Sequence, residues 1–219
     1  MPKRIAVLVS GGGTNLQALI DAQARGELVN GEIVLVISSA PGAYALERAA
    51  KAGIPSCVVA RKEYPSNQAM TAALVDRLTQ ARIDLVVLAG FMVILTGEMV
   101  QAFPNAILNV HPALIPSFSG PGCYGLHVHE KALEYGVKLT GATVHFVSEE
   151  CDGGPIVSQK AVEVLPDDTP EVLQRRVMEQ CEWQLLPQAV SLFCQDRLKV
   201  EGRTVRVLEN AECGMQNAE

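Results

Sequence analysis

The chain has 219 residues, 48% hydrophobic and 19% charged, which is typical of a folded globular protein and not of a disordered one. Its formal net charge of -6 argues against a generic nucleic-acid or anionic-membrane surface. The six cysteines include no CxxC pair, which favours reduced thiols in a cytoplasmic protein. We expect no signal peptide and no membrane span, because the longest nearly unbroken apolar run, Leu85 to Leu95, is well short of the ~20 residues needed.

The first half of the chain alternates short apolar, β-branched runs with segments of helical periodicity. This pattern predicts strands at 4–9, 32–37, 57–60 and 84–89, and helices at 14–24, 43–52 and 67–81. Nearly continuous apolar strands separated by helices indicate a parallel sheet that is covered on both faces. The expected fold class is therefore α/β, with a doubly wound, mostly parallel sheet flanked by helices and a Rossmann-like N-terminal half.

The second half predicts strands at 105–110, 139–147 and 156–164, and a helix at 126–135. A long ordered loop spans 112–125, and a turn-rich connection spans 148–155. One helix is expected from about Thr169 to Cys194, with an N-cap and a proline in its first turn. A last short strand after Arg203 and a tail that frays after about residue 207 complete a single predicted domain, 1–219.

Ser10 to Leu16 is a glycine-rich loop between the first strand and the first helix. Such a loop lets the backbone approach an anion to which helix N–H groups point. It lacks the third glycine and the acidic residue of a dinucleotide site, and the lysine of a nucleoside-triphosphate loop. What remains suits a single phosphate ester, with Thr14 and Asn15 adding side-chain hydrogen bonds. A tight turn with Thr14 as a plain helix cap is the alternative.

Asn109 and His111 lie two residues apart near the end of a predicted strand, so they project to the same side. In an open α/β sheet, the carboxyl ends of the strands are where ligands bind. An amide can stabilise an oxyanion while an imidazole moves protons near neutral pH, so this pair suits acyl-type chemistry. The alternative is a polar pair that satisfies loop backbone groups.

Asp152 precedes Gly153-Gly154-Pro155, which forces a tight turn, and a carboxylate held there can orient a histidine or raise its pKa. An ordinary acidic turn is the alternative. All four histidines fall in one stretch, but His127-Val128-His129 lacks zinc-site spacing and the cysteines offer no paired ligands. We therefore predict no metal, and interpret His145 as a hydrogen-bonded structural residue.

Jointly, these motifs resemble the phosphoribosylglycinamide formyltransferases, folate-dependent enzymes of purine synthesis. The resemblance runs from Ile5 to about Leu198 and rests on the segments 10–17, 88–95, 108–116, 125–129, 141–147 and 152–155. Asn-x-His-Pro with Asp-Gly-Gly marks the wider formyl-folate transferase fold. The glycine loop narrows it to the enzymes that act on glycinamide ribonucleotide.

The resemblance implies transfer of the formyl group of 10-formyltetrahydrofolate to the amine of 5-phosphoribosylglycinamide, with no metal. It implies that Asn109 hydrogen-bonds the developing oxyanion, that His111 manages the proton traffic, and that Asp152 holds and tunes His111. The implied substrate-binding residues are Gly12, Gly13, Thr14, Asn15 and, at the ribose, Glu182. The implied folate-binding residues are Met92, Val93, Ile94, Leu95, Asn109, Val147, Glu150 and Asp152. We expect small-molecule substrates, no nucleic-acid or membrane partner, and a homodimer as the candidate assembly.

Three departures from the family pattern are visible. Many members carry an arginine where Val93 stands and a further basic residue near Asn67, so contacts to the glutamate tail of the folate are expected to differ. The loop 117–124 is longer than in the best-known members. Cys181 beside Glu182 leaves the ribose-contacting position open by one residue.

Four rival functions differ from this one in their sequence features. Formyltetrahydrofolate hydrolases carry an additional N-terminal regulatory domain, whereas strand one is expected to start here at Arg4. Methionyl-tRNA formyltransferases carry an additional C-terminal domain for tRNA, and this acidic chain stops soon after its last helix. A non-catalytic nucleotide-binding or sensor module would explain the glycine loop but not the convergence of Asn109, His111 and Asp152. An NAD-dependent oxidoreductase fails on the missing third glycine and acidic residue.

Overall fold

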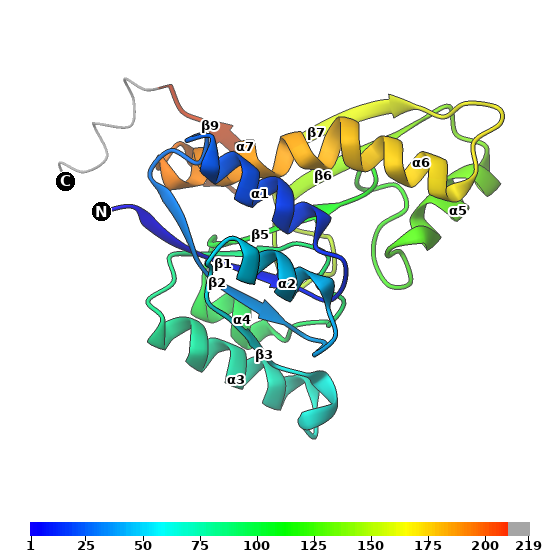
Figure 1. Ribbon diagram of the computed structural model, residues 1–219. Helices are drawn as coiled ribbons and strands as arrows, with labels where there is room; N and C mark the ends of the chain where they lie inside the picture. Colours follow the sequence, from blue (N-terminus) through cyan, green and yellow to red (C-terminus); the bar gives the residue numbers. More distant parts are fainter. Residues whose placement is uncertain (210–219) are drawn as a thin grey trace.

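The computed structural model describes residues 1–209, and every strand among them belongs to one nine-stranded sheet (Figure 1). The strands are β1 (Lys3–Val9), β2 (Gly31–Ser38), β3 (Ser56–Val58), β4 (Leu85–Leu88), β5 (Ile107–His111), β6 (Leu139–Phe146), β7 (Ile156–Glu163), β8 (Leu198–Glu201) and β9 (Thr204–Val207). The helical segments are α1 (Thr14–Ala24), α2 (Tyr44–Lys51), η1 (Arg61–Glu63), α3 (Asn67–Gln80), α4 (Gly97–Ala102), α5 (Leu126–Tyr135), α6 (Pro170–Val177), η2 (Met178–Glu182) and α7 (Trp183–Cys194).

The strand order is β3-β2-β1-β4-β5-β6-β7-β9-β8. The first five strands in this order pair in parallel, whereas β5 with β6, β6 with β7, and β8 with β9 pair antiparallel. The order reverses at β1, which lies between β2 and β4, as a doubly wound sheet requires. The predicted α/β fold with a mostly parallel sheet is confirmed.

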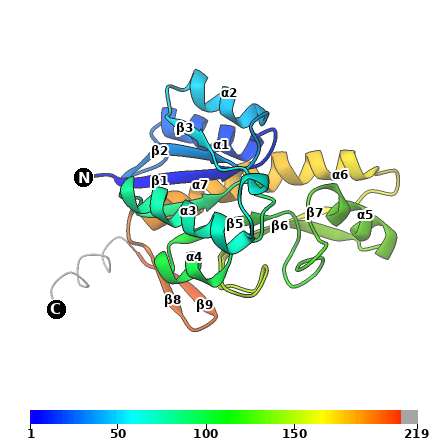
Figure 2. The same cartoon turned by 90° about the horizontal axis from the view of Figure 1, so that it is seen from below.

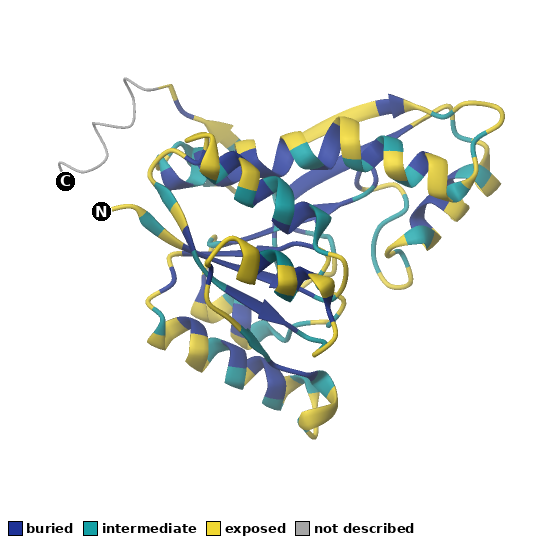
Figure 3. Cartoon of the chain, viewed as in Figure 1, coloured by how far each residue is buried: buried dark blue, intermediate teal, exposed yellow. Residues whose placement is uncertain are grey.

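Helices cover both faces of the sheet because the central strands are apolar on both sides. Along β1, Ile5, Val7 and Val9 join the core beneath α1, α2, α6 and α7. Ala6 and Leu8 join the core beneath α3 and α4. Figures 1 and 2 show these two helix layers on opposite sides of the strands, and Figure 3 shows the buried strands between them. The central strands of the sheet are therefore held between two packed cores, one on each face.

Ser10 connects three strand ends at the carboxyl edge of this sheet. Its hydroxyl lies 2.6 Å from the hydroxyl of Ser39, just after β2, and accepts a 2.8 Å hydrogen bond from the amide of Met92, beyond β4. The glycine loop that follows β1 is thus fastened to its neighbours on both sides. This edge carries the candidate site.

Several predicted boundaries need correction. β5 begins at Ile107, because Asn105 adopts a left-handed turn conformation with φ of 51°. At its other end β5 includes His111, one residue more than predicted. The helix predicted over Thr169–Cys194 is divided by the π-helical turn η2, although its predicted N-cap is correct, since Thr169 accepts a hydrogen bond from the amide of Val172.

The short elements α4 and β8 were not predicted, and the last strand is one half of a β8–β9 hairpin. Leu208, in the tail expected to fray after about residue 207, is buried and exchanges hydrogen bonds with Arg197; the tail beyond Glu209 lies outside the described residues. Within residues 1–209, no helix is both long and apolar enough to cross a membrane.

Candidate functional site

Asn109 occupies β5 directly opposite His145 on β6, and the two side chains bond to each other. The amide nitrogen of Asn109 lies 3.1 Å from Nε2 of His145, whose Nδ1 lies 2.9 Å from the carbonyl of Phe146. A carbonyl only accepts, so Nδ1 carries the hydrogen and Nε2 accepts from Asn109. Burial is the main cause that lowers the pKa of His145 and keeps it neutral. This bond fixes the orientation of the Asn109 amide and leaves its second N–H for a ligand oxygen.

Asp152 brings its carboxylate between two histidines. Its Oδ2 lies 3.6 Å from Nδ1 of His111, and its Oδ1 lies 3.7 Å from Nε2 of His145. Asp152 adopts a left-handed conformation with φ of 54°, directly before the predicted Gly153-Gly154 turn. Gly154 is required there, because a Cβ at this position would lie 1.8 Å from the carbonyl oxygen of Phe146. The structure therefore brings the three predicted catalytic residues together and adds His145 to them.

The loop between β5 and α5 lies against this cluster. Nε2 of His111 donates to the carbonyl of Phe118 at 2.8 Å, and the amide of Gly120 donates to Oδ2 of Asp152 at 2.9 Å. His111 is consequently buried, at 4% exposure. The side-chain nitrogen best placed to exchange a proton with a ligand is thus occupied by a loop carbonyl.

The glycine loop has a conformation that only glycine accepts easily. Gly13 is the N-cap of α1 with φ of 71°, and no side chain caps this helix. A Cβ on Gly13 would lie 2.6 Å from that of Ala45. The carbonyl of Gly12 is held by Arg48 Nε at 2.8 Å. The first-turn N–H groups of α1 therefore lack a side-chain acceptor, and the alternative of Thr14 as a helix cap does not hold, since Thr14 is the first residue inside α1.

Glu182 lies beneath this loop, at the end of the π-helical turn η2. Its Oε2 accepts a 2.6 Å hydrogen bond from Nδ2 of Asn15, while Thr14 Oγ1 lies 3.8 Å from Sδ of Met178 at the start of the same turn. Burial raises the pKa of Glu182 to about 7, and the bond from Asn15 partly opposes that shift. The predicted phosphate loop is therefore in direct contact with Glu182. The Asn15 side chain, expected to add a phosphate contact, donates to this carboxyl group.

The residues predicted to bind folate form two groups. Met92 and Ile94 are exposed at 51% and 67%, whereas Val93, Leu95 and Val147 pack against the core beneath α3 and α4. Glu150 is exposed in the turn before Asp152, where its carbonyl accepts from the amide of Gly153 at 3.0 Å. The structure thus places these residues on two segments that flank the carboxyl edge.

Sequence reasoning missed three functional candidates. His145 is hydrogen-bonded as predicted, but its contact with Asn109 and its place beside Asp152 were not predicted. Arg61 supplies a positive charge beside Asn67, to which it is hydrogen-bonded. His129 is fully buried, and neither ring nitrogen bonds to a residue that the structure describes. Burial, and secondarily His111, lowers the pKa of His129 to about 4. No local pattern marks these contacts, because that of His145 depends on the register of β6 against β5.

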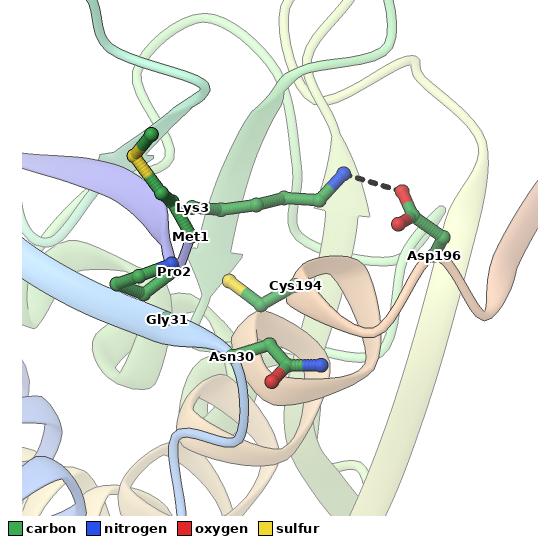
Figure 4. A pocket seen from close by; sticks show the side chains of 7 residues that line it. All are labelled: Met1, Pro2, Lys3, Asn30, Gly31, Cys194 and Asp196. Carbon is green, nitrogen blue, oxygen red and sulfur yellow. Dashed lines mark hydrogen bonds and ion pairs between the residues drawn. The ribbon is translucent and has the colours of Figure 1, made fainter.

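Over residues 1–209, no three histidine, cysteine or acidic side chains come together in a way that could hold a metal ion. The prediction that the reaction needs no metal stays a prediction. An open cavity of about 580 Å³ lies at the amino ends of β1 and β2, far along the strands from His111. Figure 4 shows its lining, in which Lys3 and Asp196 form an ion pair beside Cys194. This cavity is separate from the candidate site.

Comparison with known proteins identifies the family. A formyl transferase family model matches residues 3–190. The phosphoribosylglycinamide formyltransferase of Haemophilus influenzae is 44% identical over 199 residues, which cover 91% of each chain. This chain belongs to the phosphoribosylglycinamide formyltransferase family.

Solved structures agree with that membership. A glycinamide ribonucleotide transformylase of Symbiobacterium toebii superposes with a TM-score of 0.89 at 47% identity, covering 95% of both chains. A formyltetrahydrofolate deformylase of Pseudomonas syringae superposes with a TM-score of 0.85 at 27% identity, covering 95% of this chain and 67% of that one. The fold alone therefore does not separate transfer from hydrolysis.

Replacing Gly13 by alanine tests the glycine loop. We expect Gly13→Ala to lower the free energy of unfolding by about 2 kcal/mol, since a left-handed residue with a Cβ costs roughly 1–2 kcal/mol before the contact with Ala45 is counted. Gly11→Ala is the matched control, because a Cβ on Gly11 would have no neighbouring atom within 4 Å and the backbone there is not left-handed. Urea unfolding measures both variants, and equal losses would show that the loop conformation imposes no such constraint.

Replacing Glu182 by glutamine tests the buried carboxyl group. Its pKa is raised above the ordinary 4.5, so the folded state holds its proton more tightly than the unfolded state does. Its contribution to stability is therefore present at low pH and is lost as the pH rises from about 4.5 through about 7. Relative to wild type, Glu182→Gln should gain up to about 3 kcal/mol between pH 5 and pH 8. A pH-independent difference between the two unfolding free energies would contradict this account.

Proposed function

We propose that this chain transfers the formyl group of 10-formyltetrahydrofolate to the amine of 5-phosphoribosylglycinamide, giving the N-formyl product and tetrahydrofolate in purine biosynthesis. The family to which the chain belongs supports the reaction class. The observation that carries the proposal is the meeting of Asn109, His111 and Asp152 at the carboxyl ends of the strands. The glycine loop follows β1, which is separated from β5 by β4 alone.

Asn109 would stabilise the charge that forms on the formyl oxygen when the amine attacks the formyl carbon. Its amide is oriented by His145, so no reorientation is needed when the charge develops. A positioned amide donor of this kind contributes about 2.7–4 kcal/mol to lowering a reaction barrier. The neutral state of His145 supports this role, because only a neutral imidazole accepts from the amide.

His111 would take the proton that the attacking amine loses while in the neutral tautomer that carries its hydrogen on Nδ1, toward Asp152, in place of the Nε2–H that bonds to Phe118. Asp152 would then hold the resulting imidazolium. The 3.6 Å separation of Nδ1 from Oδ2 suits a carboxylate that orients the ring. Nε2 points to the carbonyl of Phe118, so a substrate that bonds to Nε2 must replace that carbonyl. General acid–base catalysis of this kind contributes about 10²–10⁴-fold to a rate.

The phosphate would bind at Gly12, Gly13, Thr14 and Asn15, where the first-turn N–H groups of α1 lack a side-chain acceptor. Glu182 would accept from sugar hydroxyl groups near this loop, and its hydrogen bond with Asn15 supports that role. The folate would lie between Met92–Leu95 and the turn that holds Val147, Glu150 and Asp152. Exposed apolar side chains at Met92 and Ile94 support an apolar wall there. A homodimer, a cytoplasmic location and a single domain over 1–219 stay predictions.

An absorbance assay tests the reaction. The protein is mixed with 10-formyl-5,8-dideazafolate or 10-formyltetrahydrofolate, with and without phosphoribosylglycinamide. We expect the deformylated folate to appear only when the amine substrate is present. Release without it would identify a hydrolase, the activity of the deformylase with which this fold is shared. Ligand binding with no release in either mixture would favour a non-catalytic binding module.

Substitutions of the catalytic residues test their roles. We expect His111→Ala and Asp152→Asn each to lower kcat by about a hundredfold or more, with little change in KM for the phosphate-bearing substrate. Asp152→Asn should also change the pH dependence of kcat. His127→Ala is the matched control, because His127 is exposed on α5 and pairs with Glu130. Near-normal turnover in either catalytic variant would remove that residue from the mechanism.

A further inference from the structure

Two cysteines lie on the two segments that meet at Asp152. Cys151 immediately precedes Asp152, and its Sγ lies 3.8 Å from Oδ2. The same oxygen accepts from the amide of Gly120 at 2.9 Å. One carboxylate oxygen thus connects the Cys151 turn to the loop between β5 and α5, which carries Cys123.

Cys123 is held close to this connection by a tight turn. Its amide donates to the carbonyl of Gly120 at 3.1 Å, which closes a turn whose first and last Cα atoms lie within about 7 Å. The ammonium group of Lys131, on α5, lies 3.2 Å from Sγ of Cys123 and 3.0 Å from the carbonyl of Gly122. The Cys123 side chain is therefore positioned by contacts on the protein surface, at partial exposure.

The surroundings of Cys151 raise the pKa of its thiol. Burial raises the pKa of Cys151, and Asp152 and then Cys123 raise it further. Cys151 is exposed to solvent, and Cys123 is partly exposed. Both groups are accessible to a small oxidant.

We propose that Cys123 and Cys151 form a reversible disulfide that locks the loop 112–125 over the catalytic residues. The inference rests on the proposed function for its effect on activity, but the cross-link itself does not. Both thiols lie in connections between regular elements, and the bond from Gly120 to Asp152 already joins these connections, so the disulfide would link two loops and no strand of the sheet.

The oxidant is a hydroperoxide, and the electrons balance in two steps. The sulfur of Cys123 attacks the peroxide oxygen, the O–O bond breaks, and Cys123 becomes a sulfenic acid as the peroxide is reduced to an alcohol or, for hydrogen peroxide, to water. The sulfur of Cys151 then attacks that of Cys123, the S–O bond breaks, and a second water leaves with the thiol proton. We assign the first step to Cys123, whose sulfur lies 3.2 Å from the ammonium group of Lys131. A dithiol returns both sulfurs to the reduced state.

Locking this loop would block the atoms that the proposed reaction needs. Phe118 lies on the same loop and occupies Nε2 of His111, and Gly120 occupies Oδ2 of Asp152. In the reduced protein these hydrogen bonds can exchange with those of a ligand. In the oxidised protein the covalent link keeps both partners in place.

The experiment uses the full-length, fully reduced protein treated with hydrogen peroxide and then blocked with an alkylating agent. We expect non-reducing peptide mass spectrometry to detect one peptide pair linking Cys123 to Cys151. Formyl transfer should fall more than tenfold and return after dithiothreitol. Cys123→Ser and Cys151→Ser should each abolish the cross-link, and each should retain its own untreated activity after peroxide. Cys57→Ser, at another partly exposed cysteine, is the control and should remain peroxide-sensitive.

Failure of the proposed function and failure of the disulfide proposal give different results in this experiment. A protein without formyl transfer before oxidation contradicts the proposed function, while the peptide pair still tests the disulfide. No link between Cys123 and Cys151, a link of either one to another cysteine instead, or a link that leaves activity unchanged in an active enzyme overturns the inference. Peroxide inactivation that persists in Cys123→Ser overturns it as well.

Discussion

The carboxylate of Asp152 connects three segments of the chain at the candidate site. Asp152 reaches His111 on β5, His145 on β6 and the amide of Gly120 in the following loop, so three segments of the chain depend on it. Its left-handed backbone and the two glycines after it are the local means of directing this side chain inward. The carboxylate is mostly shielded from water, with 11% of its side chain exposed. Its interactions with the histidines are therefore stronger than they would be at an open surface.

The other half of the site depends on a departure from regular helix. The π-helical turn η2 ends at Glu182, and both Cys181 and Glu182 are buried there. Glu182 meets Asn15 as its hydrogen-bond partner and has a raised pKa. A buried carboxyl group costs stability when it ionises, so its presence beside the proposed phosphate loop fits a ligand-binding role. The two halves of the site thus share one feature. In each, a carboxyl side chain, that of Asp152 or that of Glu182, lies on an irregular stretch of backbone.

Periodicity was sufficient for the fold but not for the site. The nearly continuous apolar run from Ile5 to Val9 predicted a strand buried on both faces, because every side chain of a central parallel strand meets a helix layer. The pairing of Asn109 with His145 could not be predicted, since it depends on the register of two strands far apart in sequence. The π-helical turn has no local signal that distinguishes it from the flanking helix. The short strand β8 is defined by its partner β9 more than by its own residues. What the sequence does carry locally is turn chemistry, and both Gly13 and the Asp152 turn were located from it.

The loop before α5 competes with substrate for the same atoms. Each of its two hydrogen bonds, from His111 to Phe118 and from Gly120 to Asp152, is worth about 0.5–1.5 kcal/mol net, more where a charge takes part. A ligand that uses Nε2 of His111 must first displace the loop, so its apparent affinity is lowered by the fraction of molecules in which the loop is displaced. Two such bonds reduce that affinity by about one to two powers of ten. The reduction is small enough for a substrate that binds through many other contacts to overcome.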